Sequence, residues 1–145
     1  DALKKVDNIQ DAAPELIKGK IGYRYIGSQA KYIEELKRTG VIPPMRGDDL
    51  TYFSLDKFDN PIEAISKLQL NGDMTDATWR AEFSADQIKT SVAFPKANWD
   101  DAPNIEIITR SYPQYGKGGD TQFVTQETIK LRRLINLKTG EIIIF

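Results

Sequence analysis

The sequence predicts an α+β domain, in which N-terminal strand–helix units are followed by a bent or split, mainly antiparallel sheet. Two early runs of aromatic and β-branched residues each precede a segment with apolar residues at helical spacing. Later in the chain, short β-type runs alternate with Pro, Gly, Asn and Asp. Helices early and strands late are typical of the α+β class, and 145 residues suit one compact domain.

The first strand–helix unit follows residues 1–20, which are predicted to be a linker or an N-terminal helix. Residues 21–27 ("IGYRYIG") have the aromatic and β-branched content of a strand. Ser28 is expected to cap the helix that follows, and Gly40 to end it in the left-handed conformation. The domain itself is therefore predicted to span residues 21–145.

The second unit follows residues 41–49, a predicted loop because of two prolines and a Gly-Asp-Asp cluster. Residues 50–56 ("LTYFSLD") are predicted to be a strand. Asn60 and Pro61 have the positions of a cap and a first-turn proline for the next helix. The expected apolar stripe of this helix consists of Ile62, Ile65, Leu68 and Leu70.

The sheet that follows is predicted from six short runs. These strands are expected at residues 78–84, 91–94, 105–111, 121–126, 129–137 and 141–145. Gly140 lies where a hairpin between the last two runs needs a positive φ.

Composition excludes several kinds of chemistry. The chain has no cysteine and no histidine, which excludes disulfides, thiolate or histidine metal sites, Ser-His-Asp triads and histidine acid–base pairs. No apolar run is long enough to span a membrane, and the first ten residues lack the apolar core of a secretion signal. The net charge of -1 disfavours a large nucleic-acid face, although six basic residues oppose three acidic ones in residues 104–138. Any catalysis must depend on carboxylates, Lys, Arg, Tyr, Ser, Thr or amides.

Arg24 lies in the middle of the first predicted strand. Strand alternation puts Tyr23 and Tyr25 on one face and Arg24 and Ile26 on the other. A buried arginine needs an anionic partner, because an unpaired buried cation is costly. The partner is either a carboxylate of this chain or a ligand phosphate, and the pattern alone favours neither.

Three segments stand out together: "YRYIGSQAKYIEELKRTGVIP", then "TYFS" with a short helix, then "GKGGDTQFVTQETIKL". In this order they resemble ADP-ribosyltransferase-like and NAD-glycohydrolase toxin domains, and the resemblance extends over residues 21–137. Within this family, the chain is most similar to the small C-terminal toxin domains of polymorphic systems, of the contact-dependent inhibition and Rhs types. The resemblance implies an ADP-ribosyltransferase-like fold for residues 21–145 and NAD or NADP as the substrate, with no metal.

The resemblance also implies roles for residues of the first two segments. Arg24 matches the first-strand arginine that holds a phosphate or ribose of the dinucleotide. Thr51 and Ser54 of "TYFS" match, more loosely, the hydroxyl residues that brace the site.

In the third segment, the family has a glycine-containing loop and then a strand with a catalytic glutamate. Gly118, Gly119 and Thr121 match the loop and the start of the strand, but Gln122 stands where the glutamate is expected. A neutral glutamine keeps the hydrogen bonds and loses the charge. Some members of the wider family that hydrolyse NAD have a glutamine at this position, so the resemblance implies hydrolysis rather than protein modification. Glu127 is the second candidate for the acid.

The same segment also has a purely structural interpretation. Glycines at 116, 118 and 119 suit an ordinary turn between strands, and neither a P-loop nor a GxGxxG motif is present. Tyr112 and Tyr115 could stack on nicotinamide or adenine, or could pin the loop to the core. The Asp-Asp pairs at 48–49 and 100–101 have no third ligand spaced to complete a metal site, so no metal is assigned.

The leading functional hypothesis is an antibacterial toxin domain that consumes NAD(P) by hydrolysing the nicotinamide–ribose bond. The resemblance implies export within a larger toxin, delivery to the cytoplasm of the target bacterium, and a cognate immunity protein. Transfer of ADP-ribose to a target-cell protein is a variant of this hypothesis.

Two other functions remain open from the sequence, as does an inactivated variant of the toxin. The first is a ribonuclease toxin that cleaves tRNA or rRNA with groups of the basic segment, for which the candidates are Arg110, Lys117, Thr121, Arg132 and Arg133. The second is a binding module without catalysis, whose glycine loop docks a partner. Neither needs a membrane.

Overall fold

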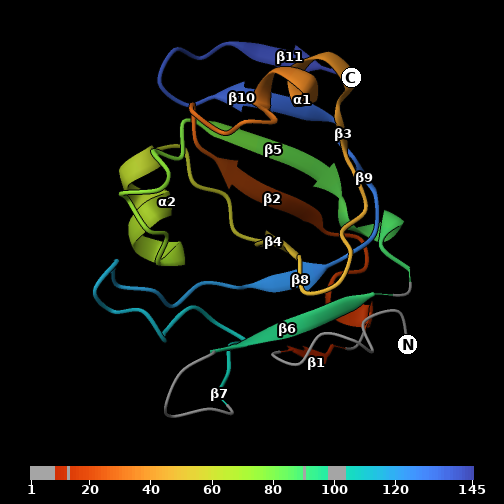
Figure 1. Cartoon of the computed structure of the whole chain (residues 1–145), viewed down its shortest axis with the longest axis vertical. Coiled ribbons are helices and arrows are strands. Elements are labelled where there is room, and N and C mark those ends of the chain that lie inside the picture. Colours follow the sequence, from red (N-terminus) through yellow and green to blue (C-terminus); the bar gives the residue numbers. More distant parts are fainter. Residues whose placement is uncertain (1–8, 13, 90, 98–103) are drawn as a thin grey trace.

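The computed structural model describes residues 9–12, 14–89, 91–97 and 104–145 (Figure 1). They form an α+β domain in which the paired strands are antiparallel, which confirms the predicted class. Neither α-helix within these ranges is long and apolar enough to cross a membrane.

The strands form two main sheets and a small ribbon. The first sheet has the order β11-β10-β5-β2, and its strands are β2 (Ile21–Ile26), β5 (Trp79–Ser84), β10 (Arg133–Asn136) and β11 (Ile142–Ile144). The second sheet has the order β1-β6-β8-β4, and its strands are β1 (Ile9–Asp11), β4 (Thr51–Phe53), β6 (Val92–Ala97) and β8 (Phe123–Thr125), with β7 (Asn104–Ile105) paired to β6. The ribbon consists of β3 (Val41–Ile42) and β9 (Ile129–Lys130).

The two main sheets meet where β2 lies beside the end of β4. Tyr23 and Ser54 form an antiparallel bridge, with main-chain N–H···O distances of 2.8 and 2.9 Å in the two directions. In Figure 1, β2 borders the first sheet and β4 the second, and α2 (Pro61–Leu68) lies beside this junction. The junction therefore brings β2 beside β4 and α2, which come later in the sequence.

The core fills the space between the sheets with aromatic and aliphatic side chains. In β5, Trp79, Ala81 and Phe83 are buried in the main apolar cluster, while Arg80 and Glu82 point to the opposite face. Phe53 of β4 packs against Phe83 with ring centroids 5.4 Å apart. Ring packing thus ties the second sheet to the first close to their junction.

The first predicted helix forms, but it begins later than its pattern indicated. α1 spans Ile33–Thr39, and Gly40 ends it in the left-handed conformation at φ 67°, as expected. The predicted cap at Ser28 is wrong, because the Ser28 N–H and hydroxyl both donate to the Asp76 carboxylate instead. This contact with a distant residue removes Ser28 from the helix start.

The second predicted helix has the expected cap and a different buried face. Asn60 Oδ1 accepts hydrogen bonds from the N–H groups of Ile62 and Glu63, and Pro61 follows it in the first turn, so the predicted cap is confirmed. Ile62, however, is 78% exposed, and Ala64 and Leu68 are the buried residues. The predicted stripe was therefore wrong at its first position.

Three further segments differ from the prediction. Val41 and Ile42, expected in a loop, form β3, and Leu131–Arg132 divides the run 129–137 between β9 and β10. Residues 105–111 are expected as one strand, but β7 ends at Ile105, and residues 106–111 bend, with an isolated bridge between Ile108 and Thr121. Glu106 Oε2 accepts hydrogen bonds from the N–H groups of Arg110 and Ser111 across this bend. This side chain satisfies donors that a strand neighbour would otherwise have to satisfy.

The segment before residue 21 belongs to the folded domain wherever the structure describes it. β1 pairs with β6 through residues 9–11, and a single 3₁₀ turn spans Pro14–Leu16. Ala12 and Ile17 are buried in the main core cluster. Residues 9–12 and 14–20 therefore extend the domain beyond the predicted boundary at residue 21, and residues 1–8 and 13 lie outside the described ranges.

Candidate functional site

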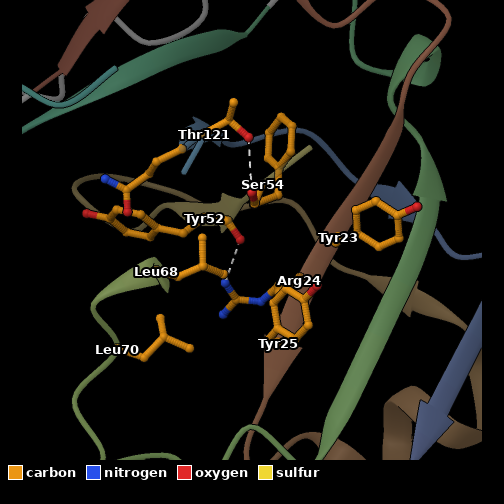
Figure 2. Close-up of a pocket in the computed structure, with 10 residues that line it drawn as sticks. Tyr23, Arg24, Tyr25, Tyr52, Ser54, Leu68, Leu70 and Thr121 are labelled. Carbon is orange, nitrogen blue, oxygen red and sulfur yellow. Dashed lines mark hydrogen bonds between the residues drawn. The ribbon is translucent and has the colours of Figure 1, made fainter. Parts of the chain in front are cut away.

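A pocket opens at the junction of the two sheets, beside the C-terminal end of α2. We call it the Arg24 pocket, and it is lined by Tyr23, Arg24, Tyr25, Tyr52, Phe53, Ser54, Leu68, Leu70, Thr121 and Gln122. Figure 2 shows Arg24 extending from β2 toward Tyr52, with Leu68 and Leu70 beside it and Ser54 and Thr121 hydrogen-bonded to each other. Each of the three segments that carry the resemblance thus contributes at least one polar side chain to the lining of this pocket.

Arg24 is held in the pocket by neutral oxygen atoms. Its Nη1 donates to the main-chain oxygen of Tyr52 at 2.9 Å, and its Nη2 donates to the Tyr32 hydroxyl at 3.3 Å. Within the described residues, no carboxylate forms an ion pair with this guanidinium. Of the two partners considered for Arg24, the internal carboxylate is therefore not found in this part of the chain.

Ser54 and Thr121 are joined through one carboxylate. Asp56 Oδ2 accepts hydrogen bonds from the Thr121 N–H at 2.7 Å and the Thr121 hydroxyl at 2.8 Å, and the two hydroxyl oxygens of Ser54 and Thr121 are 3.0 Å apart. Thr121 Oγ1 also accepts a hydrogen bond from the Leu55 N–H. This network fixes the wall of the Arg24 pocket that β4 and the segment before β8 share.

Gln122 lies at the border between the Arg24 pocket and a second one. Its Nε2 donates to Glu106 Oε1 at 2.9 Å, although the two residues are 16 positions apart in the sequence. The second pocket, which we call the Glu106 pocket, is lined by Tyr52, Leu68, Gln69, Leu70, Asn71, Pro95, Glu106, Tyr112 and Gln122. Because Tyr52, Leu68, Leu70 and Gln122 line both pockets, the two are neighbours.

Glu106 is the residue of this region that the sequence analysis missed. It is 4% exposed, and it lies in the run "IEII", which was interpreted as part of a strand. A single acid among apolar residues is the signal that could have identified it, because a buried carboxylate requires specific partners.

Tyr52 separates the two pockets. Partial burial, together with the neighbouring Tyr112 and Glu106, raises the pKa of the Tyr52 hydroxyl above its usual value. The side chain therefore stays a neutral donor and acceptor at neutral pH. Its main-chain oxygen accepts the hydrogen bond from Arg24, while the charge of Glu106 acts on the pKa of its hydroxyl.

Four of the predicted site residues line neither pocket: Thr51, Glu127 and the two glycines Gly118 and Gly119. Thr51 is fully buried in β4, and its hydroxyl has no hydrogen-bond partner among the described residues. The Glu127 carboxylate accepts hydrogen bonds from the N–H groups of Lys89 and Ser91, where it holds the chain that enters β6. The structure thus brings Arg24, Ser54, Thr121 and Gln122 together, and leaves Thr51 and Glu127 elsewhere.

The glycines of the loop before β8 pack against α2 and a turn. A Cβ atom on Gly116 would lie 2.3 Å from the Ser66 oxygen, and one on Gly118 would lie 2.3 Å from the Thr109 oxygen. The N–H groups of Gly118 and Gly119 donate to these two oxygens, respectively, at 3.0 and 2.7 Å. Both N–H groups are therefore engaged within the protein, and neither glycine lines either pocket.

The two tyrosines of this loop have structural contacts of their own. Tyr112 and Tyr115 stack with ring centroids 6.0 Å apart, and the Tyr115 hydroxyl accepts a hydrogen bond from Asn71 Nδ2. Tyr112 also lines the Glu106 pocket. Tyr115 therefore has a structural role, in which it pins the loop, whereas Tyr112 also borders the Glu106 pocket.

No family model, curated protein or solved structure matches this chain. What points to a function is the geometry of the two pockets, together with the resemblance of the short motifs.

The candidates for ribonuclease activity lie in separate places. Arg133 on β10 is bound to Glu82 at 2.7 Å, and Arg132 beside it is exposed. Lys117 lines a shallow surface next to α2. In Figure 1, β10 lies near the top, while the loop around residue 117 lies at the lower left. Of these candidates, Thr121 alone lines the Arg24 pocket.

The carboxylates of the described chain form no cluster that could hold a metal ion. Asp56 and Asp120 come close to each other behind Thr121, where burial and then the Asp56 charge raise the pKa of Asp120. The Asp-Asp pair at 100–101 lies outside the described residues.

Proposed function

We propose that this domain hydrolyses NAD or NADP at the bond between nicotinamide and ribose. The observation that carries the proposal is the meeting of Arg24, Ser54, Thr121 and Gln122 in one pocket, from segments about 30 to 100 positions apart in the sequence. Three of the sequence motifs that resemble the toxin family thereby contribute a side chain to the same cavity. The fold that the proposal assumes is the ADP-ribosyltransferase-like one.

The guanidinium of Arg24 is the natural anchor for a phosphate of the dinucleotide. It has no carboxylate partner among the described residues, and two neutral oxygens hold it in position. An arginine so placed gains a charge-assisted hydrogen bond when an anion binds, and loses no existing ion pair.

The reaction itself needs stabilisation of a cationic ribose. The bond from ribose C1 to the nicotinamide nitrogen breaks, and its electron pair leaves with neutral nicotinamide. The oxygen of a water molecule then bonds to C1, one proton of the water is released to solvent, and the second product is ADP-ribose or its 2′-phosphate. Gln122 supplies an amide that can hydrogen-bond the ribose hydroxyls next to C1.

The biological setting that accompanies this activity is that of a bacterial toxin. A domain that depletes NAD(P) harms the cell that makes it, so we propose export within a larger toxin, action in the cytoplasm of the target bacterium, and a cognate immunity protein. Binding of that immunity protein over the Arg24 pocket would block the substrate.

The test is release of nicotinamide from NAD and NADP by the purified domain, with tRNA and rRNA cleavage followed in parallel. We expect release by the wild type, a strong loss in Arg24→Ala and Gln122→Ala, and wild-type release in Arg132→Ala, which removes an exposed arginine outside both pockets. Release that survives Arg24→Ala would refute the assignment of the pocket.

The same samples separate the other functions. Defined RNA fragments with intact NAD would establish the ribonuclease, and incorporation of label from NAD into a protein would establish transfer. If NAD, NADP and RNA all stay intact, the proposed hydrolysis is overturned. The functions that then remain are a binding module and an inactivated toxin.

A further inference from the structure

Glu106 is a buried carboxylate that no cation neutralises among the described residues. Its Oε2 accepts hydrogen bonds from the N–H groups of Ser111 at 2.6 Å and Arg110 at 3.3 Å, and its Oε1 accepts one from Gln122 Nε2 at 2.9 Å. These three donors are uncharged amides, and a side chain that only accepts has the bonding pattern of an ionised carboxylate. Glu106 therefore contributes a negative charge to the border of the two pockets.

A second buried glutamate of the same domain shows the contrast. Glu82 is 6% exposed, and it binds Arg80 at 2.8 Å and Arg133 at 2.7 Å. Its charge is compensated inside the protein, whereas the partners of Glu106 among the described residues are uncharged N–H groups. An uncompensated charge acts over a longer distance in a poorly hydrated site.

The two oxygens of Glu106 make different kinds of contact. Oε2 binds main-chain donors and is fixed by the turn at residues 106–111. Within the described part of the chain, Oε1 binds a side chain, the amide of Gln122, and this contact dictates how the amide is oriented. Because the NH2 group of Gln122 is bound to Glu106, its carbonyl oxygen points away from Glu106, and a bond to a carboxylate increases the negative charge on that oxygen.

We propose that Glu106 is a positioning residue that turns the Gln122 amide so that its carbonyl oxygen, made more negative by the neighbouring charge, faces the substrate ribose. The inference depends on the proposed hydrolysis and identifies the source of the negative charge that a glutamine at position 122 lacks. Glu106 and Gln122 together then do what a single glutamate would do: accept a hydrogen bond from a ribose hydroxyl and stabilise positive charge on C1.

The decisive variant is Glu106→Gln. Its carbonyl oxygen must stay with the N–H groups of Ser111 and Arg110, so its new NH2 group faces Gln122 and forces that amide to turn over. The Gln122 NH2 group then faces the pocket. We expect kcat for nicotinamide release to fall about a hundredfold, with a much smaller change in KM.

Combining Glu106→Gln with Gln122→Glu exchanges the two groups. The introduced carboxylate accepts a hydrogen bond from the new amide and again presents an oxygen atom to the pocket, so most of the lost kcat is expected to return. The matched control is Asp76→Asn, since Asp76 also binds main-chain N–H groups, those of Ser28 and Thr78, but lies outside both pockets. This control is expected to keep the wild-type kcat.

Gln122→Glu alone provides a test that does not require Glu106→Gln to fold. It puts two carboxylates within hydrogen-bond distance, and such a pair shares one proton. We expect kcat of this variant to fall as the pH rises above the range in which glutamates ordinarily titrate, about pH 4 to 5. The wild type and the double variant are expected to show no such fall in kcat. A pH profile like that of the wild type would overturn the proposal.

A readout without substrate separates this inference from the proposed function. In the wild type, the Gln122 side-chain NH2 group is bound to a buried carboxylate, so its hydrogen exchange, followed by NMR on ¹⁵N-labelled protein, is expected to be slow. In Glu106→Gln it is expected to be fast. If the wild type releases no nicotinamide, the hydrolysis fails, and equal exchange rates in the two proteins overturn the orientation of Gln122 independently. Full kcat in Glu106→Gln would overturn the positioning role.

Discussion

Arg24 donates from Nη1 to the main-chain oxygen of Tyr52 at 2.9 Å, and this bond connects β2 to β4 across the pocket at the sheet junction. A second bond, from Nη2 to the Tyr32 hydroxyl, connects the same side chain to the segment before α1. The guanidinium has further N–H groups, so its planar fork is oriented by the protein while donors remain for a ligand.

Replacing Arg24 is expected to weaken ligand binding in a graded way. Arg24→Ala removes the charge-assisted hydrogen bonds, so the affinity for ADP-ribose is expected to fall about 10- to 100-fold. Arg24→Lys keeps the positive charge but loses the planar set of guanidinium N–H donors, so an intermediate affinity is expected. Isothermal titration calorimetry measures these values, with Arg132→Ala as the control. Equal affinity in Arg24→Ala and wild type would exclude Arg24 as the anchor.

The glycine loop gives a prediction about stability. Gly118→Ala introduces a Cβ 2.3 Å from the Thr109 oxygen at φ +67°, so we expect it to lower the free energy of unfolding by about 3 kcal/mol or more. Gly119→Ala, at φ +98° with open space around it, is expected to lose about 1–2 kcal/mol from backbone strain alone. Urea unfolding measures both losses. The control is Gly72→Ala, where a Cβ meets no atom within 4 Å and φ is not positive. A larger loss for Gly119→Ala than for Gly118→Ala would contradict this explanation of the loop.

Local patterns predicted much of the fold because their causes are local. The alternation of Tyr23, Arg24 and Tyr25 follows from strand geometry, and the register confirms it, since Arg24 lies opposite the core residue Ala81 while Tyr25 lies opposite Arg80. The caps at Asn60 and Gly40 likewise depend on neighbouring residues alone.

Specific carboxylate contacts, which residue spacing does not reveal, account for two of the errors. Ser28 does not cap α1, because the Asp76 carboxylate, 48 positions later, binds it. Glu106 bends the predicted strand at residues 105–111 into a turn and binds Gln122. A carboxylate partner far along the chain has no periodic signal, so sequence spacing could identify Gln122 as a candidate but not the residue that orients it.

Glu127 is expected to matter for stability rather than for catalysis. Glu127→Ala removes the acceptor of the Lys89 and Ser91 N–H groups, so the free energy of unfolding is expected to fall by about 1–3 kcal/mol. Glu127→Gln keeps one acceptor oxygen and is expected to lose less. Denaturant unfolding measures the stability, and nicotinamide release is assayed at a temperature where both variants are folded. A large loss of kcat with unchanged stability would restore Glu127 as a candidate acid.

The buried ion pair between Arg80 and Glu82 of β5 gives a further prediction about stability. Arg80 and Glu82 have side chains 5% and 8% exposed. Glu82→Gln leaves the buried Arg80 with the exposed Asp59 as its one remaining ionic partner among the residues that the structure describes. A loss of about 3–5 kcal/mol in the free energy of unfolding is expected. The control is Glu35→Gln, which breaks the exposed pair with Arg38 and should change stability little. Similar losses in both variants, measured by thermal unfolding, would refute the argument from burial.

Asp120 is expected to destabilise the folded domain when it is ionised. Burial, reinforced by the Asp56 carboxylate, raises the pKa of Asp120 above its value in the unfolded chain. The folded state then holds this proton to higher pH than the unfolded state, so stability is lost as the pH rises from the unfolded pKa through the folded one. Asp120→Asn removes that loss. We expect the variant to be more stable than the wild type at pH 7 and about equally stable at pH 3, as measured by urea unfolding at both values. A variant less stable at pH 7 would show that the ionised carboxylate stabilises the fold, and that Asp56 and Asp120 do not repel each other behind Thr121.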